Sequence, residues 1–189
     1  MGARAGLDRA QVIEAAAVIA DESGADGLTL AALAARLGVR SQSLYAHVDG
    51  LEGLRRDLAV HGQQQLASRL GSAVMGRAGA GALRALAAAY AGFAAERPGL
   101  YACALRAPLG DAALEASAEA ASAPWRATLR SFGLSAAETE HYHRALWAAL
   151  HGFVTLRGAG LMTRVASTDR SFTTMIDVFV EALTVSARV

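Results

Sequence analysis

A short stretch at residues 40–48 is dense in side chains that donate and accept hydrogen bonds. If it forms a helix, only Leu44 and Val48, four residues apart, need to face inward. Glutamine pairs with the edge of adenine and arginine with that of guanine. The outward surface therefore has the chemistry to contact double-stranded DNA, and it comprises Arg40, Ser41, Gln42, Ser43, Tyr45, Ala46 and His47.

The residues before this stretch have the pattern of a helix that would position it. An apolar face recurs at i, i+3, i+4 and i+7, formed by Leu30, Leu33, Ala34 and Leu37. Thr29 stands where an N-cap hydroxyl is expected, and Gly38 stands where a left-handed residue ends a helix. With a second helix over 41–48, residues 29–48 are predicted to form a helix-turn-helix.

Residues 29–48, TLAALAARLGVRSQSLYAHV, resemble the N-terminal segment of the TetR-like bacterial transcriptional regulators. The family pattern is T-x-x-x-L-A-x-x-L-G-V followed by L-Y-x-H, and it is matched in register by Thr29, Leu33, Ala34, Leu37, Gly38, Val39, Leu44, Tyr45 and His47. The run W-x-x-L-H-G-F at 147–153 is similar to one branch of TetR-like C-terminal domains. The chain departs from the pattern at Arg40, where a capping hydroxyl is usual, and at Leu51, where a lysine often opens the fourth helix.

The resemblance implies a homodimeric, ligand-responsive transcriptional regulator, most often a repressor in this family. Two recognition helices would enter successive major grooves of a palindromic operator. Contacts to base edges are expected from Gln42, Ser43, Arg40 and Ser41. Contacts to phosphates are expected from Tyr45, His47 and Thr29.

The charge of the N-terminal segment is lower than phosphate binding usually requires. Residues 1–62 carry six arginines against eight acidic residues, a formal balance of −2, and the whole chain carries only +1. Non-specific DNA affinity comes mainly from phosphate neutralisation. We therefore expect affinity to depend on placed contacts rather than on net charge, and a helical small-molecule-binding or scaffold protein without DNA binding stands as the alternative.

Composition favours an all-α fold of about nine helices. Alanine is abundant, hydrophobic residues make up 53% of the 189 residues, and there are only three prolines. Besides the helix-turn-helix pair, apolar periodicity and capping signals predict helices over residues 8–23, 51–70, 82–96, 99–106, 111–132, 135–158 and 171–187. Pro124 is expected to kink or split the helix that contains it.

Glycines at 71, 76, 79 and 81 mark a change of organisation along the chain. We predict a DNA-binding domain at 1–50, a connecting helix at 51–75 and a ligand-binding and dimerisation domain at 76–189. Cys103 is the only cysteine, and no apolar leader or membrane-length segment is found, so a cytoplasmic protein is expected.

The last two predicted helices are apolar on more than one side, whereas a helix that faces a single core needs one apolar stripe. We therefore predict that they form a dimer interface in a four-helix bundle, as TetR-like proteins do. The alternative is burial within one larger core. The predicted interface residues are Leu146, Leu150, Phe153, Phe172, Met175, Phe179 and Leu183, and a second stripe on the last helix comprises Val178, Ala182, Val185 and Val189.

Large side chains are sparse in the alanine-rich C-terminal part. A few aromatic residues with sparse polar groups are typical of a small-molecule site, and the resemblance implies such a pocket. The predicted pocket residues are Phe93, Tyr101, Cys103, Trp125, Trp147 and His151.

Catalysis, cofactors and metal sites are not expected. His141 and His143 diverge by about 200° on a helix, so they cannot chelate one metal together. His143 and His151 share a face with Trp147, but no carboxylate or cysteine is placed to complete a site. The glycine-rich segment at 76–83 lacks a preceding strand and a lysine, so a linker is favoured over a phosphate loop. An enzyme that uses these histidines is the second alternative.

Overall fold

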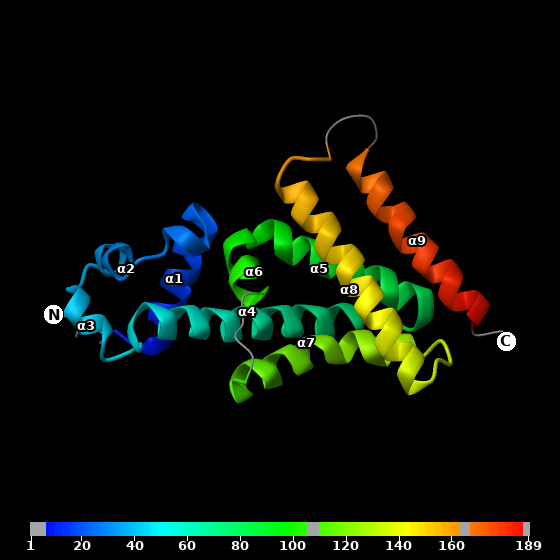
Figure 1. The fold of residues 1–189 in the computed structure, drawn as a ribbon, viewed down its shortest axis with the longest axis horizontal. Helices are drawn as coiled ribbons and strands as arrows, with labels where there is room; N and C mark the ends of the chain where they lie inside the picture. Colours follow the sequence, from blue (N-terminus) through cyan, green and yellow to red (C-terminus); the bar gives the residue numbers. More distant parts are fainter. Residues whose placement is uncertain (1–6, 106–109, 163–166, 187–189) are drawn as a thin grey trace. The chain divides into compact units, whose positions relative to one another are not determined.

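The structure is a computed structural model that describes residues 7–105, 110–162 and 167–186 (Figure 1). Within these ranges every regular element is helical, which confirms the all-α prediction. The α-helices are α1 (Arg9–Ser23), α2 (Leu30–Leu37), α3 (Ser41–Leu44), α4 (Gly50–Val74), α5 (Gly79–Glu96), α6 (Pro98–Leu105), α7 (Ala112–Arg130), α8 (Ala136–Gly158) and α9 (Thr168–Ser186), and a 3-10 helix, η1, covers Ala25–Gly27.

Most helix starts and stops follow from local sequence. Asp8 and Gln11 form a reciprocal capping box at α1, and Ser135 and Glu138 form another at α8. The hydroxyl oxygen of Thr29 accepts a hydrogen bond from Ala32 N, 3.1 Å away, and Gly38 ends α2 at φ 66°. A left-handed backbone at that point favours glycine, because glycine has no Cβ to clash with the following carbonyl.

Several predicted helix limits differ from the structure, and α5 and α9 each begin three residues earlier than predicted, at Gly79 and Thr168. The recognition helix α3 ends at Leu44, and the chain then turns instead of continuing as helix to Val48. Helix α4 continues through Gly71 to Val74. Pro124 does not split α7, which continues through it as one helix; the buried side chains of Trp125 and Leu129 lie in the turns that follow the proline. The predicted helix ends at Arg106 and Ala187 lie outside the described residues.

The chain packs into two compact units. Unit 1 consists of residues 1–65 and 97–118, so it contains α1 to α3, the first part of α4, α6 and the start of α7. Helices α2 and α6 both pack against α1. Its fully buried side chains include Val12, Ala16, Leu33, Leu44, Leu54, Leu58 and Leu100. The helix-turn-helix therefore shares one core with α4 and α6.

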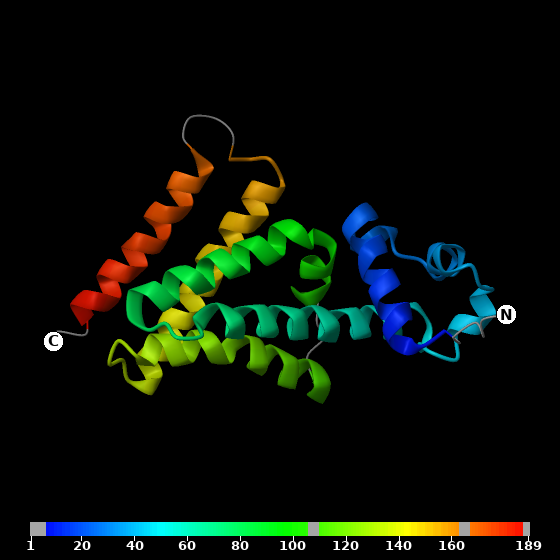
Figure 2. The same cartoon turned by 180° about the vertical axis from the view of Figure 1, so that it is seen from behind.

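Unit 2 consists of residues 66–96 and 119–189. Helix α5 packs against α8 and α9, which lie beside each other in both ribbon views (Figures 1 and 2). Its fully or almost fully buried side chains include Leu83, Leu86, Tyr90, Leu129, Leu146, Leu150 and Leu183. The predicted domains 1–50, 51–75 and 76–189 are continuous segments, whereas each compact unit combines two separate segments. Helix α6, for example, belongs to unit 1.

Candidate nucleic-acid interface

The polar face of α3 is exposed, as the sequence predicts for a surface that contacts DNA. Leu44 is fully buried and Val48 is 4% exposed, so these two residues fix the short helix to unit 1. Arg40 occupies the N-cap position, and no side-chain hydrogen bond caps the helix there. The exposed residues of this face are Arg40, Ser41, Gln42, Ser43 and Tyr45.

The three residues expected at phosphates lie near the ends of the two helices. Tyr45 directly follows α3 and is 61% exposed. His47 is half-buried in the turn, where its backbone N donates to Leu44 O at 2.9 Å. Thr29 is exposed, and the capping bond uses its oxygen as acceptor, so its hydroxyl hydrogen can still donate.

A bidentate ion pair connects α2 to α1. Arg36 Nη1 donates to Glu22 Oε2 at 2.7 Å, and Nη2 donates to Oε1 at 3.1 Å. This pairing lowers the pKa of Glu22 and raises that of Arg36. The pair is exposed to solvent, so its main effect is on the geometry of the two helices rather than on stability.

A groove of about 380 Å³ lies beside the recognition helix. Its walls come from α1, the turn after α3 and the first turns of α4, and the lining residues are Arg9, Tyr45, Ala46, His47, Val48, Asp49, Gly53, Arg56 and Asp57. Asp57 is only 7% exposed, and both of its carboxylate oxygens accept from Arg9 Nη2 at 2.7 Å. Arg9, Arg56 and Asp57 were not among the residues predicted from sequence.

One sequence signal could have identified Asp57. It lies three residues after Leu54 and directly before Leu58, both of which are fully buried, so its position on α4 is close to the inward face. A charged residue near an inward face requires a partner. Its partner Arg9 is 48 residues away and carries no local signal.

The structure does not bring the six predicted pocket residues together in one unit. Phe93 and Trp125 are buried in unit 2, where Trp125 meets Tyr90 edge to face, with ring centroids 6.3 Å apart and planes at 74°. Trp147 is 48% exposed and stacks on His151, with centroids 5.9 Å apart and planes at 15°. Half of its surface faces solvent in the single chain, so Trp147 does not line an enclosed cavity there.

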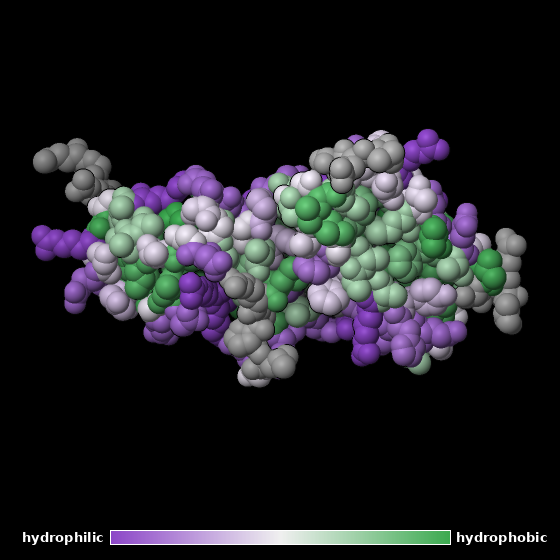
Figure 3. Space-filling view, turned by 45° about the horizontal axis from the view of Figure 1, so that its top comes forward, coloured by the Kyte–Doolittle hydropathy of each residue, from purple (hydrophilic) through white to green (hydrophobic). Residues whose placement is uncertain are grey.

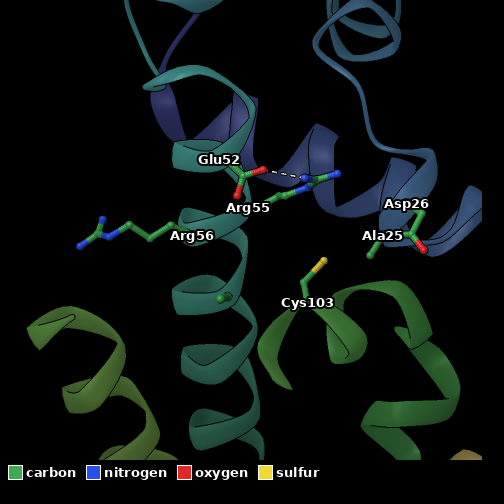
Figure 4. Close-up of a pocket in the computed structure, with 7 residues that line it drawn as sticks. Ala25, Asp26, Glu52, Arg55, Arg56 and Cys103 are labelled. Atoms are coloured by element: carbon green, nitrogen blue, oxygen red, sulfur yellow. Dashed lines mark hydrogen bonds and ion pairs between the residues drawn. The ribbon is translucent and has the colours of Figure 1, made fainter. Parts of the chain in front are cut away.

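The other two predicted pocket residues, Tyr101 and Cys103, belong to unit 1. Cys103 on α6 lines a separate cavity of about 270 Å³, together with Ala25, Asp26, Glu52, Arg55, Arg56 and Ala59. Figure 4 shows the Cys103 sulfur directed toward the space beside Arg55, whose guanidinium pairs with Glu52 at 2.6 Å, whereas Arg56 points away. This cavity lies within the unit that contains the helix-turn-helix.

The predicted dimer interface requires a correction. Leu146, Leu150 and Leu183 are at most 1% exposed in the single chain, and Phe153 is 6% exposed. A side chain with almost no free surface in the protomer has little surface to lose to a partner, so these four buried residues belong to the core of the protomer. Phe172, Met175 and Phe179 are partly exposed, and Phe172 contacts Phe153 with ring centroids 5.2 Å apart.

Exposed apolar side chains remain on both α8 and α9, and those of α9 belong to its second stripe. Val178 and Val185 on α9 are 59% and 64% exposed, and Leu156 on α8 is 44% exposed. Ala182 and the small residues Ala145 and Ala148 are also exposed. The space-filling view shows a broad apolar area over α8 and α9 (Figure 3). Val189, which the sequence placed on this stripe, lies outside the described residues.

The described residues contain no group of three or more His, Cys, Asp or Glu side chains that could hold a metal ion. His143 is partly buried, and this burial, together with the charge of Arg126, lowers its pKa. Within the same described ranges, no helix is both long and apolar enough to cross a membrane.

Comparison with known proteins places this geometry in a family. Residues 83–179 match the family described as "Tetracyclin repressor-like, C-terminal domain". The chain is 38% identical over 172 residues to the HTH-type transcriptional regulator Rv0681 of Mycobacterium tuberculosis, covering 90% of this chain and 78% of the relative. It is 34% identical over 187 residues to the HTH-type transcriptional regulator YobS of Bacillus subtilis, covering 98% and 97%.

Solved structures agree with this placement. A protein of unknown function from Rhodococcus sp. RHA1 superposes with a TM-score of 0.82 at 25% identity, covering 96% of this chain and 97% of that one. TetR from Acinetobacter baumannii AYE has the same fold, with a TM-score of 0.70 at 22% identity and coverage of 96% and 99%. The chain therefore belongs to the TetR family of helix-turn-helix proteins, and it is a DNA-binding transcriptional regulator.

Proposed function

We propose that the protein acts as a homodimeric repressor that binds a palindromic operator in the cytoplasm and is released by a small molecule. The observation that carries this proposal is the row of exposed hydrogen-bonding side chains on α3, held in place by the buried Leu44 and Val48. TetR family regulators bind DNA, form dimers and bind small-molecule effectors. Because the family is generally non-enzymatic, we propose that binding alone accounts for the activity.

Within each half-site, the side chains divide into two roles. Bases are read by Gln42 and Ser43, with Arg40 and Ser41 beside them at the start of the helix, and the exposure of all four supports this role. The backbone phosphates are contacted by Tyr45, His47 and Thr29. These contacts fix the register of the helix but do not distinguish one sequence from another.

The dimer is formed by the exposed stripe of α8 and α9. Val178, Val185 and Leu156 expose apolar surface that is costly to leave in water, and Ala145 and Ala148 allow close approach of a partner helix. Two copies related by a two-fold axis would bury these side chains against each other in a four-helix bundle. The partly exposed Phe172, Met175 and Phe179 are proposed to lie at the edge of this contact.

The effector is proposed to bind among the aromatic side chains of unit 2. Phe93, Trp125 and Tyr90 are the large residues at its centre, and Trp147 with His151 lies on the exposed side of α8. A structure of a TetR variant from Acinetobacter baumannii AYE contains minocycline, which indicates that the fold can hold a multi-ring ligand. An effector releases DNA only to the extent that it binds the DNA-free state more tightly.

Selection of operators from a random pool of duplex DNA tests the central claim. We expect a single inverted repeat whose half-sites are about 34 to 36 Å apart centre to centre. The purified protein should retain the selected duplex, and this retention should weaken with added salt. Failure to enrich any sequence, combined with no retention of random duplex, would favour a helical binding protein that does not contact DNA.

A further inference from the structure

The groove beside the recognition helix contains a guanidinium that is held in place and still has donors without a hydrogen-bond acceptor among the described residues. Arg9 is the first residue of α1, and only its Nη2 donates hydrogen bonds to Asp57. Among the described residues, no hydrogen bond engages its Nε or Nη1. The side chain is 59% exposed, so these remaining donors are open to a ligand in the groove.

Asp57 determines where this guanidinium lies. Its carboxylate is 8% exposed as a side chain and accepts from Arg9 through both oxygens, and one of them also accepts from Arg56 Nη1 at 3.4 Å. Arg56 in turn donates through Nε and Nη2 to Asp111, the residue that precedes α7. An exposed arginine normally samples many rotamers, and a buried bidentate acceptor removes much of that freedom before any ligand arrives.

The neighbours of Arg9 indicate what the ligand is. Tyr45 and His47 line the same groove, and they lie one and three residues after the recognition helix, so the groove is next to the side chains that we propose to contact the DNA backbone. The groove carries two arginines but also Asp49 and Asp57, so net charge alone does not attract an anion. Attraction has to come from directed donors, for which the geometry of a guanidinium suits a phosphate oxygen.

We propose that this groove is a seat for one DNA backbone phosphate, with Arg9 as the donor that contacts it and Asp57 as the residue that positions Arg9. The seat compensates for the family lysine that is replaced by Leu51 in this chain and for the formal charge of −2 over residues 1–62. The inference rests on DNA binding by α3 and adds a contact from α1, a helix outside the helix-turn-helix.

The test measures binding to a fluorescent duplex of arbitrary sequence, long enough for two half-sites, over a range of salt concentrations. Arg9→Ala should weaken binding roughly tenfold. The slope of log K against log salt should fall by about 0.9 for each bound protomer, since one phosphate contact is lost. Arg77→Ala is the matched control, because Arg77 is an exposed arginine of unit 2 whose Nη1 donates to Ala73 O near the end of α4, and it should leave the slope unchanged.

The Asp57→Asn variant separates positioning from simple charge. Removing a carboxylate near DNA should strengthen binding if only net charge matters, whereas loss of the Arg9 partner should weaken it. We expect weaker binding, and we expect the double variant Arg9→Ala with Asp57→Asn to bind no more weakly than Arg9→Ala alone. Circular dichroism checks that each variant keeps its helices. If Asp57→Asn unfolds, the salt dependence of Arg9→Ala decides whether Arg9 contacts a phosphate, because the exposed Arg9 side chain can be truncated without opening the core.

An unchanged slope for Arg9→Ala, or tighter binding by a folded Asp57→Asn, would overturn the phosphate seat while leaving DNA binding intact. Absence of any salt-dependent binding by the unaltered protein would instead refute the DNA-binding function itself. The two failures are therefore distinguishable in one set of titrations.

Discussion

Gly99 in α6 lies directly against the backbone of Ala20 in α1, with no room for a side chain between them. Asp21 strengthens this contact, because its carboxylate accepts from Leu100 N at 2.9 Å and from Arg97 Nε at 2.5 Å. The first turn of α6 is thus fixed to the end of the first helix of the DNA-binding unit. The contact depends on glycine for close approach rather than for an unusual backbone angle.

Gly99→Ala should therefore lower the free energy of unfolding by about 1 to 3 kcal/mol, since the added methyl group meets backbone that cannot rotate away. The matched control is Gly71→Ala in α4, where a Cβ meets nothing within 4 Å. That change should raise stability by about 0.5 to 1 kcal/mol, because alanine favours helix. Urea titration of both variants measures the difference, and equal effects would contradict the tight contact.

Gln42→Ala should relax the preferred base at one position of each half-site by about 1 to 3 kcal/mol. Tyr45→Ala, three residues later, should weaken binding to all DNA sequences by a similar factor because it removes a phosphate contact. Operator selection followed by competition binding with single-base variants measures both effects. If Gln42→Ala selects the same motif as the unaltered protein, Gln42 does not read a base.

Val178→Glu should give a folded monomer whose DNA affinity is greatly reduced, since a monomer carries one helix-turn-helix and cannot contact the second half-site. The residue is 59% exposed in the protomer, so a charge there is costly only when a partner covers it. Leu183→Glu, at a fully buried position of the same helix, should instead abolish folding. Sedimentation and circular dichroism distinguish these outcomes, and a helical dimer for Val178→Glu would exclude this stripe as the interface.

Asp111→Asn should destabilise unit 1 in a pH-dependent way. Hydrogen bonds from the Arg56 guanidinium, and then from the backbone N–H groups of Leu114 and Ala113, lower the pKa of Asp111 from 3.8 to about 2. A depressed carboxyl pKa contributes stability that is fully present above pH 3.8 and is lost as pH falls through about 2.

The stability difference between the unaltered protein and Asp111→Asn should therefore be constant above pH 3.8 and shrink as pH approaches 2. Asparagine keeps the ability to accept the two backbone hydrogen bonds, so the variant isolates the charge. Denaturant unfolding at several pH values provides the measurement. A gap that stays constant down to pH 2 would show that the ion pair with Arg56 does not stabilise the fold.

The limits of most helices were predictable because the groups that set them are close in sequence. Asp8 bonds Gln11, Ser135 bonds Glu138 and Thr29 bonds Ala32, each three residues away. The helix-turn-helix followed from the same local rules, together with the resemblance of residues 29–48 to one family. Where the local signal was weak, as at the end of the recognition helix, the predicted boundary was wrong, because α3 ends at Leu44 and not at Val48.

Only the tertiary structure decided which surfaces are free. Both stripes on α9 are apolar in sequence, and packing against α5 and α8 buries Ile176, Val180 and Leu183 while it leaves Val178 and Val185 exposed. Arg9 meets Asp57 across 48 residues, and Arg56 meets Asp111 across 55. Periodicity describes how one helix repeats, but it holds no information on which distant segment will cover each face, because that choice depends on how all the helices fill a common core.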